Sequence, residues 1–434
     1  MSITEKIGII GGGISGLSAA WHLSKDSEVV LFEKNSYLGG HAHTVEVKDV
    51  DNIVNIDTGF MVYNDANYPN LIKLFENLKI DSYSSDMSFS LSVDSLNYEY
   101  SGSGLTGYFG QIKNLFNLNH WKQLFYIRKF YLNAEKNIRK YNSSSTLREF
   151  LVAEKYPEYF IQNHVIPMCS AIWSCSPEKM LDYPALDFVR FFANHGLFKL
   201  SKRPLWKSII GGSVKYVDGI VNSSSFVTKL NTEIIAIKKN KNKYEISTCD
   251  EEKETFDKLI FATPANVSYK IIQPFDSELA EILANFEYQE NVAILHNDSS
   301  QMPKTKKLWS SWNYIKKDNS KNSKNLSITY WLNSIQKLKT NLNFFLTLNP
   351  CSQIKEESIH KVIRFSHPIF DTKNRILKNE IIKKQGKNNV WICGSFLGYG
   401  FHEDGIQSGL LVAEDISKRN RPWTTDQSWN RLAN

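Results

Sequence analysis

Three glycines near the N-terminus have the spacing of a pyrophosphate-binding turn. They lie between the apolar segment 6–10 and the apolar and small residues of 17–23. A strand, glycine turn and helix in this order bind a dinucleotide, because the glycines let the backbone approach the phosphates and the helix N-terminus supplies N–H groups. We therefore predict cofactor contacts from Gly11, Gly13, Ile14, Ser15 and Gly16.

A carboxylate follows at the distance where such sites bind ribose. Glu33 ends a second apolar segment, 28–32, and stands 33 − 13 = 20 positions after Gly13. A carboxylate there accepts hydrogen bonds from the adenosine ribose hydroxyls, so Glu33 and the adjacent Lys34 are predicted to lie at the ribose. A second GxGxxG pattern, 102–107, precedes no strand that ends in an acid, and we predict a Gly/Ser loop there.

A second strand, glycine-rich loop and helix are predicted near the C-terminus. The apolar segment 389–393 leads into Gly394 and Ser395, the loop 398–405 follows, and 406–413 is predicted to be helical. The pair Gly39 and Gly40 adds another turn soon after Glu33. These turns favour a cofactor longer than a nicotinamide dinucleotide, with the C-terminal helix directed at the edge of an isoalloxazine ring.

The loop 398–405 also carries the side chains that could do chemistry. His402 or Glu403 could accept a proton from a carbon next to one that loses hydride, and Tyr399 could place its ring against the cofactor. Two alternatives stay open. His402 could contact the cofactor or make a structural hydrogen bond, and Glu403 and Asp404 could cap the helix that follows.

Together these motifs resemble the flavin-containing amine oxidase and phytoene desaturase superfamily. A narrower resemblance covers nearly the whole chain. It is to a bacterial family of FAD-dependent oxidoreductases that accompany cyclopropane fatty acid synthase-like methyltransferases. The matching segments are 39–44, 57–60, 86–90, 171–174, 191–196, 311–314, 329–331 and 398–405.

The resemblance implies a non-covalent FAD, because the cysteine that binds flavin covalently in some amine oxidases is missing from the C-terminal loop. His41 stands where many amine oxidases carry an arginine against the pyrophosphate. Trp173 and His195 lie in two of the matching segments, where substrate contact and core packing are alternatives. Further cofactor contacts are implied for Gly39, Gly40, His41, Thr58, Gly59, Phe60, Ile234, Gly394, Ser395, Gly405 and Ile406.

The implied activity is dehydrogenation or desaturation of an unsaturated or methylated fatty acyl chain, with an acyl-chain methyltransferase as a possible partner. Aromatic residues make up 13% of the chain. Two inserts between the parts of the cofactor domain, the first at 66–202 and the second at 268–385, carry many of them and could line an apolar tunnel. An amine oxidase and a non-catalytic flavin-binding partner of a lipid methyltransferase are the alternatives.

The resemblance also implies an α/β fold with two domains. We expect a Rossmann-like, glutathione-reductase-type domain that binds FAD and a second α+β substrate domain, as in amine oxidases. The first is expected to comprise 1–65, 203–267 and 386–420, and the second 66–202 and 268–385.

Composition excludes several other classes. The five cysteines form no CxxC pair, and His41 and His43 have no evident third ligand, so we expect neither disulfides nor a metal. No nucleic-acid-binding motif is present. No apolar run approaches the roughly 20 residues that cross a bilayer, and no secretory signal is evident, which predicts a cytoplasmic protein.

The net charge of +7 has two interpretations. Basic clusters at 304–307, 316–324 and 383–387 could be solvated loops, or they could attract the protein to an anionic membrane surface. Peripheral association with the inner face of the membrane is therefore an alternative to a purely cytoplasmic location.

Overall fold

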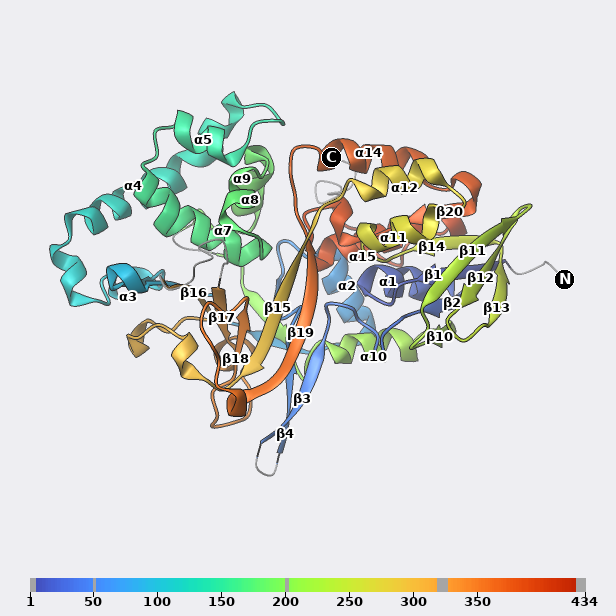
Figure 1. Cartoon of the computed structure of the whole chain (residues 1–434), viewed down its shortest axis with the longest axis horizontal. Helices are drawn as coiled ribbons and strands as arrows, with labels where there is room; N and C mark the ends of the chain where they lie inside the picture. The colour runs from blue at the N-terminus through green and yellow to red at the C-terminus, as the bar shows by residue number, and fades with distance from the viewer. Residues whose placement is uncertain (1–4, 50–51, 200–202, 318–326, 427–434) are drawn as a thin grey trace.

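Strands from distant parts of the chain lie side by side in one parallel sheet (Figure 1). The computed structural model describes residues 5–49, 52–199, 203–317 and 327–426. Of the segments predicted to be strands, 6–10, 28–32 and 389–393 all contribute to this sheet. In spatial order the strands are β10 (Val227–Lys229), β2 (Glu28–Phe32), β1 (Lys6–Ile10), β14 (Lys258–Phe261) and β20 (Val390–Ile392).

Apolar residues cover both faces of this sheet, as expected for buried parallel strands. Ile7 and Ile9 pack on the side of the helices α1 (Ile14–Leu23), α10 (Val214–Asn222) and α15 (His402–Ser417). Val30 and Phe32 belong to the core on the other side. That side is covered by β11 (Ile234–Asn240), β12 (Lys243–Thr248), β13 (Lys253–Phe256), α11 (Ala265–Ile272), α12 (Ser277–Ala284) and α14 (Asn374–Lys384).

Both predicted inserts contribute to a second sheet of seven strands. β7 from the first insert pairs in parallel with β16 from the second, so the two inserts form one layer. The order is β19 (Ile359–Pro368), β15 (Tyr288–His296), β18 (Phe345–Leu348), β17 (Ser327–Trp331), β16 (Trp312–Lys316), β7 (Phe89–Val93) and β8 (Tyr98–Ser101).

Helices make up most of the first insert. Their core is aromatic and includes Phe130, Phe160, Phe188 and Phe192. The helices are α3 (Gly104–Tyr108), α4 (Leu118–Asn137), α5 (Leu147–Ala153), α6 (Glu158–Phe160), α7 (Ile166–Trp173), α8 (Pro177–Leu181) and α9 (Ala185–Asn194).

The remaining elements connect the two sheets. β3 and β4 form a long hairpin that projects from the molecule, and β9 pairs with both β5 and β6 (Figure 1). Their bounds are β3 (Thr44–Asp49), β4 (Asn52–Asp57), β5 (Tyr63–Asn64), α2 (Pro69–Leu78), β6 (Ser82–Ser84), β9 (Trp206–Ile209) and α13 (Leu332–Gln336). Among the described residues, no helix is long and apolar enough to cross a membrane.

Some predictions of local structure were wrong. Helix α15 begins at His402, four residues before the predicted start, so Glu403 and Asp404 lie in its first turn. The segment 102–107 is not entirely a loop, because α3 begins at Gly104. Most of the basic cluster 316–324 lies outside the described residues.

Helices α1 and α15 cross at a distance that only glycine allows. A Cβ atom on Gly409 would lie 2.1 Å from the Ser15 carbonyl oxygen and 2.3 Å from Ser18 Oγ. A Cβ on Gly405 would lie 2.7 Å from Ile14 Cγ2. This contact places the N-terminal parts of the two helices side by side, which is the arrangement needed if both are to contact one cofactor.

The crossing predicts a selective cost for a single methyl group. Gly409→Ala should lower the free energy of unfolding by about 1–3 kcal/mol, because the backbone of α1 cannot move away without disturbing the sheet. Gly102→Ala is the matched control, since its Cβ would approach only one atom, at 3.7 Å. Urea unfolding measures both. Equal stability of the two variants would contradict the close crossing.

Candidate active site

The predicted pyrophosphate turn has the geometry that an anion requires. The N–H of Gly11 donates to the Phe32 carbonyl oxygen (2.8 Å), and Gly11 adopts a φ of +110°. Gly13 is the N-cap of α1, and a Cβ built on it would have no atom within 4 Å. The N-terminus of α1 therefore faces open space beside a backbone without side chains, and a phosphate group fits there.

Glu33 is held in place by the same turn. Its Oε2 accepts from the N–H of Gly12 (2.8 Å) and its Oε1 accepts from the N–H of Asn35 (2.9 Å). A carboxylate offers about four acceptor sites, so the buried Glu33 can still accept from ribose hydroxyls. The neighbouring Lys34 is exposed.

The Gly39 and Gly40 pair lies directly against the first turn. The N–H of Gly39 donates to the Gly12 carbonyl oxygen (2.8 Å), and a Cβ on Gly40 would lie 3.2 Å from the Cα of Gly13. Both residues have positive φ, +112° and +60°. The structure thus brings together two glycine turns that are separate in sequence, as the prediction of one extended cofactor site requires.

Beyond this pair, two predicted segments run side by side. The N–H of Phe60 donates to the His41 carbonyl oxygen (2.7 Å), and the N–H of Thr58 donates to the His43 carbonyl oxygen (2.9 Å). Gly59 has no room for a side chain, because its Cβ would lie 2.1 Å from the His41 oxygen. These contacts lead from the pyrophosphate turn toward α15.

The first residue of α15 completes the site. The ring of His402 stacks on Phe60, with centroids 3.8 Å apart and planes 7° apart. His402 Nε2 lies 2.7 Å from the hydroxyl oxygen of Tyr216, on α10. The three predicted regions, around Gly13, Gly40 and His402, therefore lie along one continuous path.

Several residues predicted to contact the cofactor have buried side chains. The side chains of Ile14 and Ile406 are buried between α1, α15 and the sheet, and that of Ile234 is buried on the other side. The N–H of Gly394 donates to Ser408 Oγ (3.0 Å), which ties the end of β20 to α15. Ser395 lies close to Gly405, because a Cβ built on Gly405 would be 4.0 Å from the Cβ of Ser395.

Glu403 does not have the surroundings of a proton acceptor for substrate. Its Oε1 accepts from the backbone and side-chain N–H groups of Asn70 (3.0 and 2.7 Å), and its Oε2 accepts from the N–H of Leu71 (3.0 Å). The fully buried carboxylate therefore caps α2 and joins it to α15, which favours a structural role over the two roles predicted, proton acceptor and cap of α15. Asp404 caps its own helix by accepting from the N–H of Phe401 (2.8 Å).

Four histidines surround the start of α15. The ring of His41 lies 5.0 Å from that of Phe365 and 5.2 Å from that of His367. Desolvation by the surrounding protein lowers the pKa values of His367 and His402 to about 3. It lowers the pKa of His41 as well, although the His41 side chain is exposed. His43 has a lowered pKa for the same reason. These imidazoles are neutral at physiological pH, so this part of the site carries no positive charge from histidine.

An aromatic wall adjoins His402 on the side of the first insert. Phe401 stacks on Phe191, with centroids 4.9 Å apart, and lies 6.3 Å from Trp173 and 6.2 Å from His195. The ring of Tyr399 is 6.4 Å from that of Phe191. Trp173 and His195 are buried, so they pack in the core of the helical insert, and the partly exposed Tyr399 and Phe401 continue this packing to the first turn of α15.

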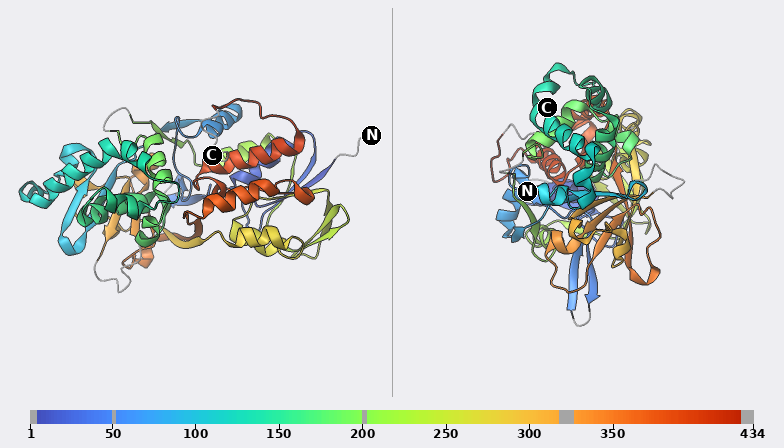
Figure 2. Two further views of the ribbon diagram at one scale, coloured as in Figure 1. Left: turned by 90° about the horizontal axis from the view of Figure 1, so that it is seen from above. Right: turned by 90° about the vertical axis from the view of Figure 1, so that its left-hand side faces the viewer.

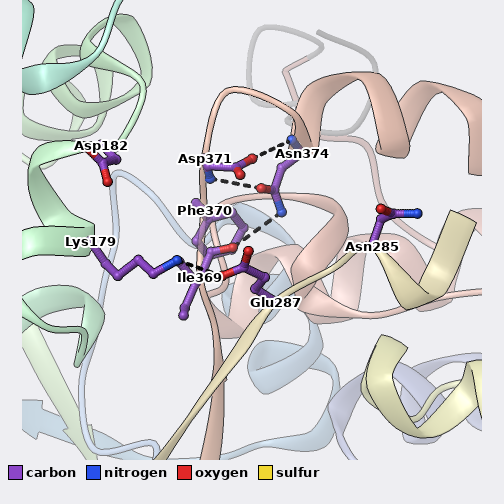
Figure 3. A pocket seen from close by; sticks show the side chains of 8 residues that line it. All are labelled: Lys179, Asp182, Asn285, Glu287, Ile369, Phe370, Asp371 and Asn374. Carbon is purple, nitrogen blue, oxygen red and sulfur yellow. Dashed lines mark hydrogen bonds and ion pairs between the residues drawn. The ribbon is translucent and has the colours of Figure 1, made fainter.

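A small polar pocket lies behind this wall. It has a volume of about 70 Å³ and is crossed by an ion pair between Lys179 Nζ and Glu287 Oε2 (2.7 Å), as Figure 3 shows. Phe370 separates it from the site, since its ring lies 2.9 Å from the position of a Cβ on Gly400. A volume of this size holds a few water molecules, so this pocket is not the predicted acyl tunnel.

Sequence reasoning missed the residues that act from other elements. Tyr216 on α10 contacts His402, and Asp57 accepts from the N–H (2.8 Å) and Oγ (2.7 Å) of Ser213, just before α10. Burial raises the pKa of Asp57 to about 6. Asp57 belongs to the segment 57–60, which was one available signal, whereas no local pattern marks Tyr216 or His367.

The sequence model of one protein family, the flavin containing amine oxidoreductases, matches residues 14–304 of this chain. The chain belongs to this family. Its members are enzymes that use a flavin, so the protein is a flavin-dependent oxidoreductase. A comparison with curated protein sequences gives no match.

Three solved structures illustrate the similarity of fold. A protein from Exiguobacterium sp. 255-15 with the proposed activity of a protoporphyrinogen oxidase has a TM-score of 0.70 at 13% identity, over 96% of this chain and 99% of that one. A CLA-producing fatty acid isomerase from P. acnes has a TM-score of 0.65 at 12% identity, over 96% and 99%. Putrescine oxidase bound to putrescine has a TM-score of 0.64 at 14% identity, over 96% and 100%.

The site predicts that flavin retention depends on Glu33. Glu33→Ala should weaken flavin binding about ten- to a hundredfold, because it removes a charged acceptor from the site. Flavin absorbance per mole of protein after gel filtration measures the effect. Glu28→Ala is the matched control, because the Glu28 carboxylate forms an ion pair with Lys6 at the protein surface. Full flavin content in Glu33→Ala would contradict the assigned role.

Proposed function

We propose that the protein binds FAD without a covalent bond and dehydrogenates or desaturates an unsaturated or methylated fatty acyl chain. We also propose that 1–65, 203–267 and 386–420 form the FAD-binding domain and that 66–202 and 268–385 form the substrate domain. The observation that carries the substrate proposal is the set of partly exposed rings at the start of α15, those of Tyr399, Phe401 and His402.

The choice of FAD rests on two features of the site. The turn at Gly13 and the carboxylate of Glu33 fit a pyrophosphate and a ribose, which only a flavin dinucleotide combines with the isoalloxazine ring. Bound FAD supplies the hydride acceptor for the reaction. Denaturing the purified protein should release FAD, and release of FMN or NAD would overturn this part of the proposal.

The acyl substrate is favoured because the two carboxylates next to His402 in the sequence are engaged in the protein interior. Glu403 and Asp404 both accept hydrogen bonds from backbone N–H groups and are fully buried. Aromatic rings and neutral imidazoles form the surface that remains, and such a surface binds an apolar chain. A fatty acid isomerase is among the proteins of similar fold, which supports a lipid substrate.

His402 is the side chain that we propose moves a proton. Its lowered pKa keeps the imidazole neutral, which leaves one ring nitrogen as an acceptor, while a pKa of about 3 makes the resting ring a weak base. Nδ1 is available if Nε2 carries hydrogen and donates it to the Tyr216 oxygen, 2.7 Å away. Tyr216 would then act as a positioning residue that selects this tautomer.

An amine substrate is the second candidate. Putrescine oxidase and cyclohexylamine oxidase are among the proteins of similar fold. The partly exposed rings of Tyr399 and Phe401 could bind an ammonium group through cation–π contacts.

The narrower family resemblance adds an acyl-chain methyltransferase as a proposed partner of the acyl-oxidising enzyme.

Anaerobic reduction of the bound flavin distinguishes the two substrates. Unsaturated or methylated acyl lipids should bleach its absorbance, and small primary amines should not. His402→Asn should slow this reduction by about a hundredfold or more while flavin content stays unchanged. His360→Asn, in an exposed histidine of β19, is the control. Bleaching by amines alone would replace the acyl proposal with the amine one.

A further inference from the structure

We propose that the surface formed by α3, the 3-10 turn Ile112–Phe116 and α4 docks on an anionic lipid bilayer. We call it the α3–α4 surface. Large apolar side chains stand out into solvent there, with exposed fractions of 85% for Phe116, 75% for Leu118 and 70% for Ile112. Clustered exposure of this kind marks an interaction site.

The apolar residues of α4 form a stripe on the side opposite the core. At 3.6 residues per turn, Leu118, Trp121, Phe125 and Leu132 lie within an arc of about 60°. The buried residues of the same helix, which include His120 and Phe130, lie on the opposite side. The stripe is therefore additional to the face that the fold uses.

The stripe continues into the turn before the helix. Trp121 Nε1 donates to the Leu115 carbonyl oxygen (2.9 Å), and the Trp121 ring lies 4.6 Å from that of Phe109. These contacts hold the turn and the helix together as one surface. A partly exposed tryptophan at its edge is suited to the interface between lipid and water.

The charge of the segment indicates which partner the surface fits. Residues 105–140 contain seven lysines and arginines but a single acid, Glu135. Lys122 and Lys136 lie along one edge of the stripe and Arg128 along the other, and all three are exposed. Apolar side chains flanked by basic ones are the pattern of a helix that lies in an anionic membrane surface.

The position of the surface leaves it open to a bilayer. Helices α3 and α4 lie at the end of the molecule opposite β11, β12 and β13 (Figure 1), and the view from above shows the same end projecting (Figure 2, left). Docking would leave the parallel sheet and its helices outside the membrane. This inference goes beyond the proposed function and does not depend on the substrate.

Flotation with lipid vesicles tests the inference on the flavin-loaded full chain. Wild-type protein should float with vesicles that contain phosphatidylglycerol and much less with phosphatidylcholine alone, and binding should weaken at high salt. The triple variant Phe116→Ser, Leu118→Ser, Phe125→Ser should bind about tenfold more weakly or worse.

The matched control replaces three apolar residues of similar exposure elsewhere. Leu205→Ser, Ile235→Ser and Ile376→Ser together should leave vesicle binding unchanged. Flavin content and unfolding midpoint verify that both triple variants are folded. The inference is overturned if wild-type protein does not float, or if both variants bind as wild type does. It is also overturned if the α3–α4 substitutions turn a dimer into a monomer, because a second copy would then cover the surface.

Discussion

The close crossing of α1 and α15 is the constraint on which the site depends. Gly405 and Gly409 bring the backbone of α15 against Ile14 and Ser15, so the N-termini of two helices from opposite ends of the chain become neighbours. One helix end faces the open space beside Gly13, and the other presents His402. The two ends of a long cofactor can be served together only because no side chain separates these helices.

Two buried carboxylates hold the surroundings of this crossing. Glu403 joins the first turn of α15 to that of α2, and Asp57 joins the segment before Phe60 to the start of α10. Both accept from backbone N–H groups, which compensates for the cost of burying them. They leave the surface near His402 to aromatic rings and neutral histidines. The surface near His402 is therefore apolar because both carboxylates are engaged in these structural contacts.

The sequence predicted the parts of the site whose signals are local. The glycine turn of 11–16, the carboxylate at position 33 and the pair of glycines at 39–40 are each recognisable within a few residues, and the structure brings them together. The start of α15 was predicted four residues too late, because the segment 402–405 contains a glycine and an aspartate, which have low helix propensity. The contact of Glu403 with α2 was not predicted, because its partner Asn70 is 333 positions away in the sequence.

Contacts such as Tyr216 with His402, or His41 with His367, could not be predicted in this way. They depend on how separate elements pack, and one sequence carries no record of that packing. The α3–α4 surface was hidden for a different reason. An apolar stripe in a helix is typical of core packing, and only the fold reveals that α4 buries its other side.

A crystal structure of the flavin-loaded protein tests the central claim most directly. The account predicts the adenosine ribose at Glu33, the pyrophosphate beside Gly13 at the N-terminus of α1, and the isoalloxazine ring near Phe60 and His402 at the start of α15. A flavin bound elsewhere, or one whose ring lies far from α15 while its pyrophosphate is at Gly13, would contradict it.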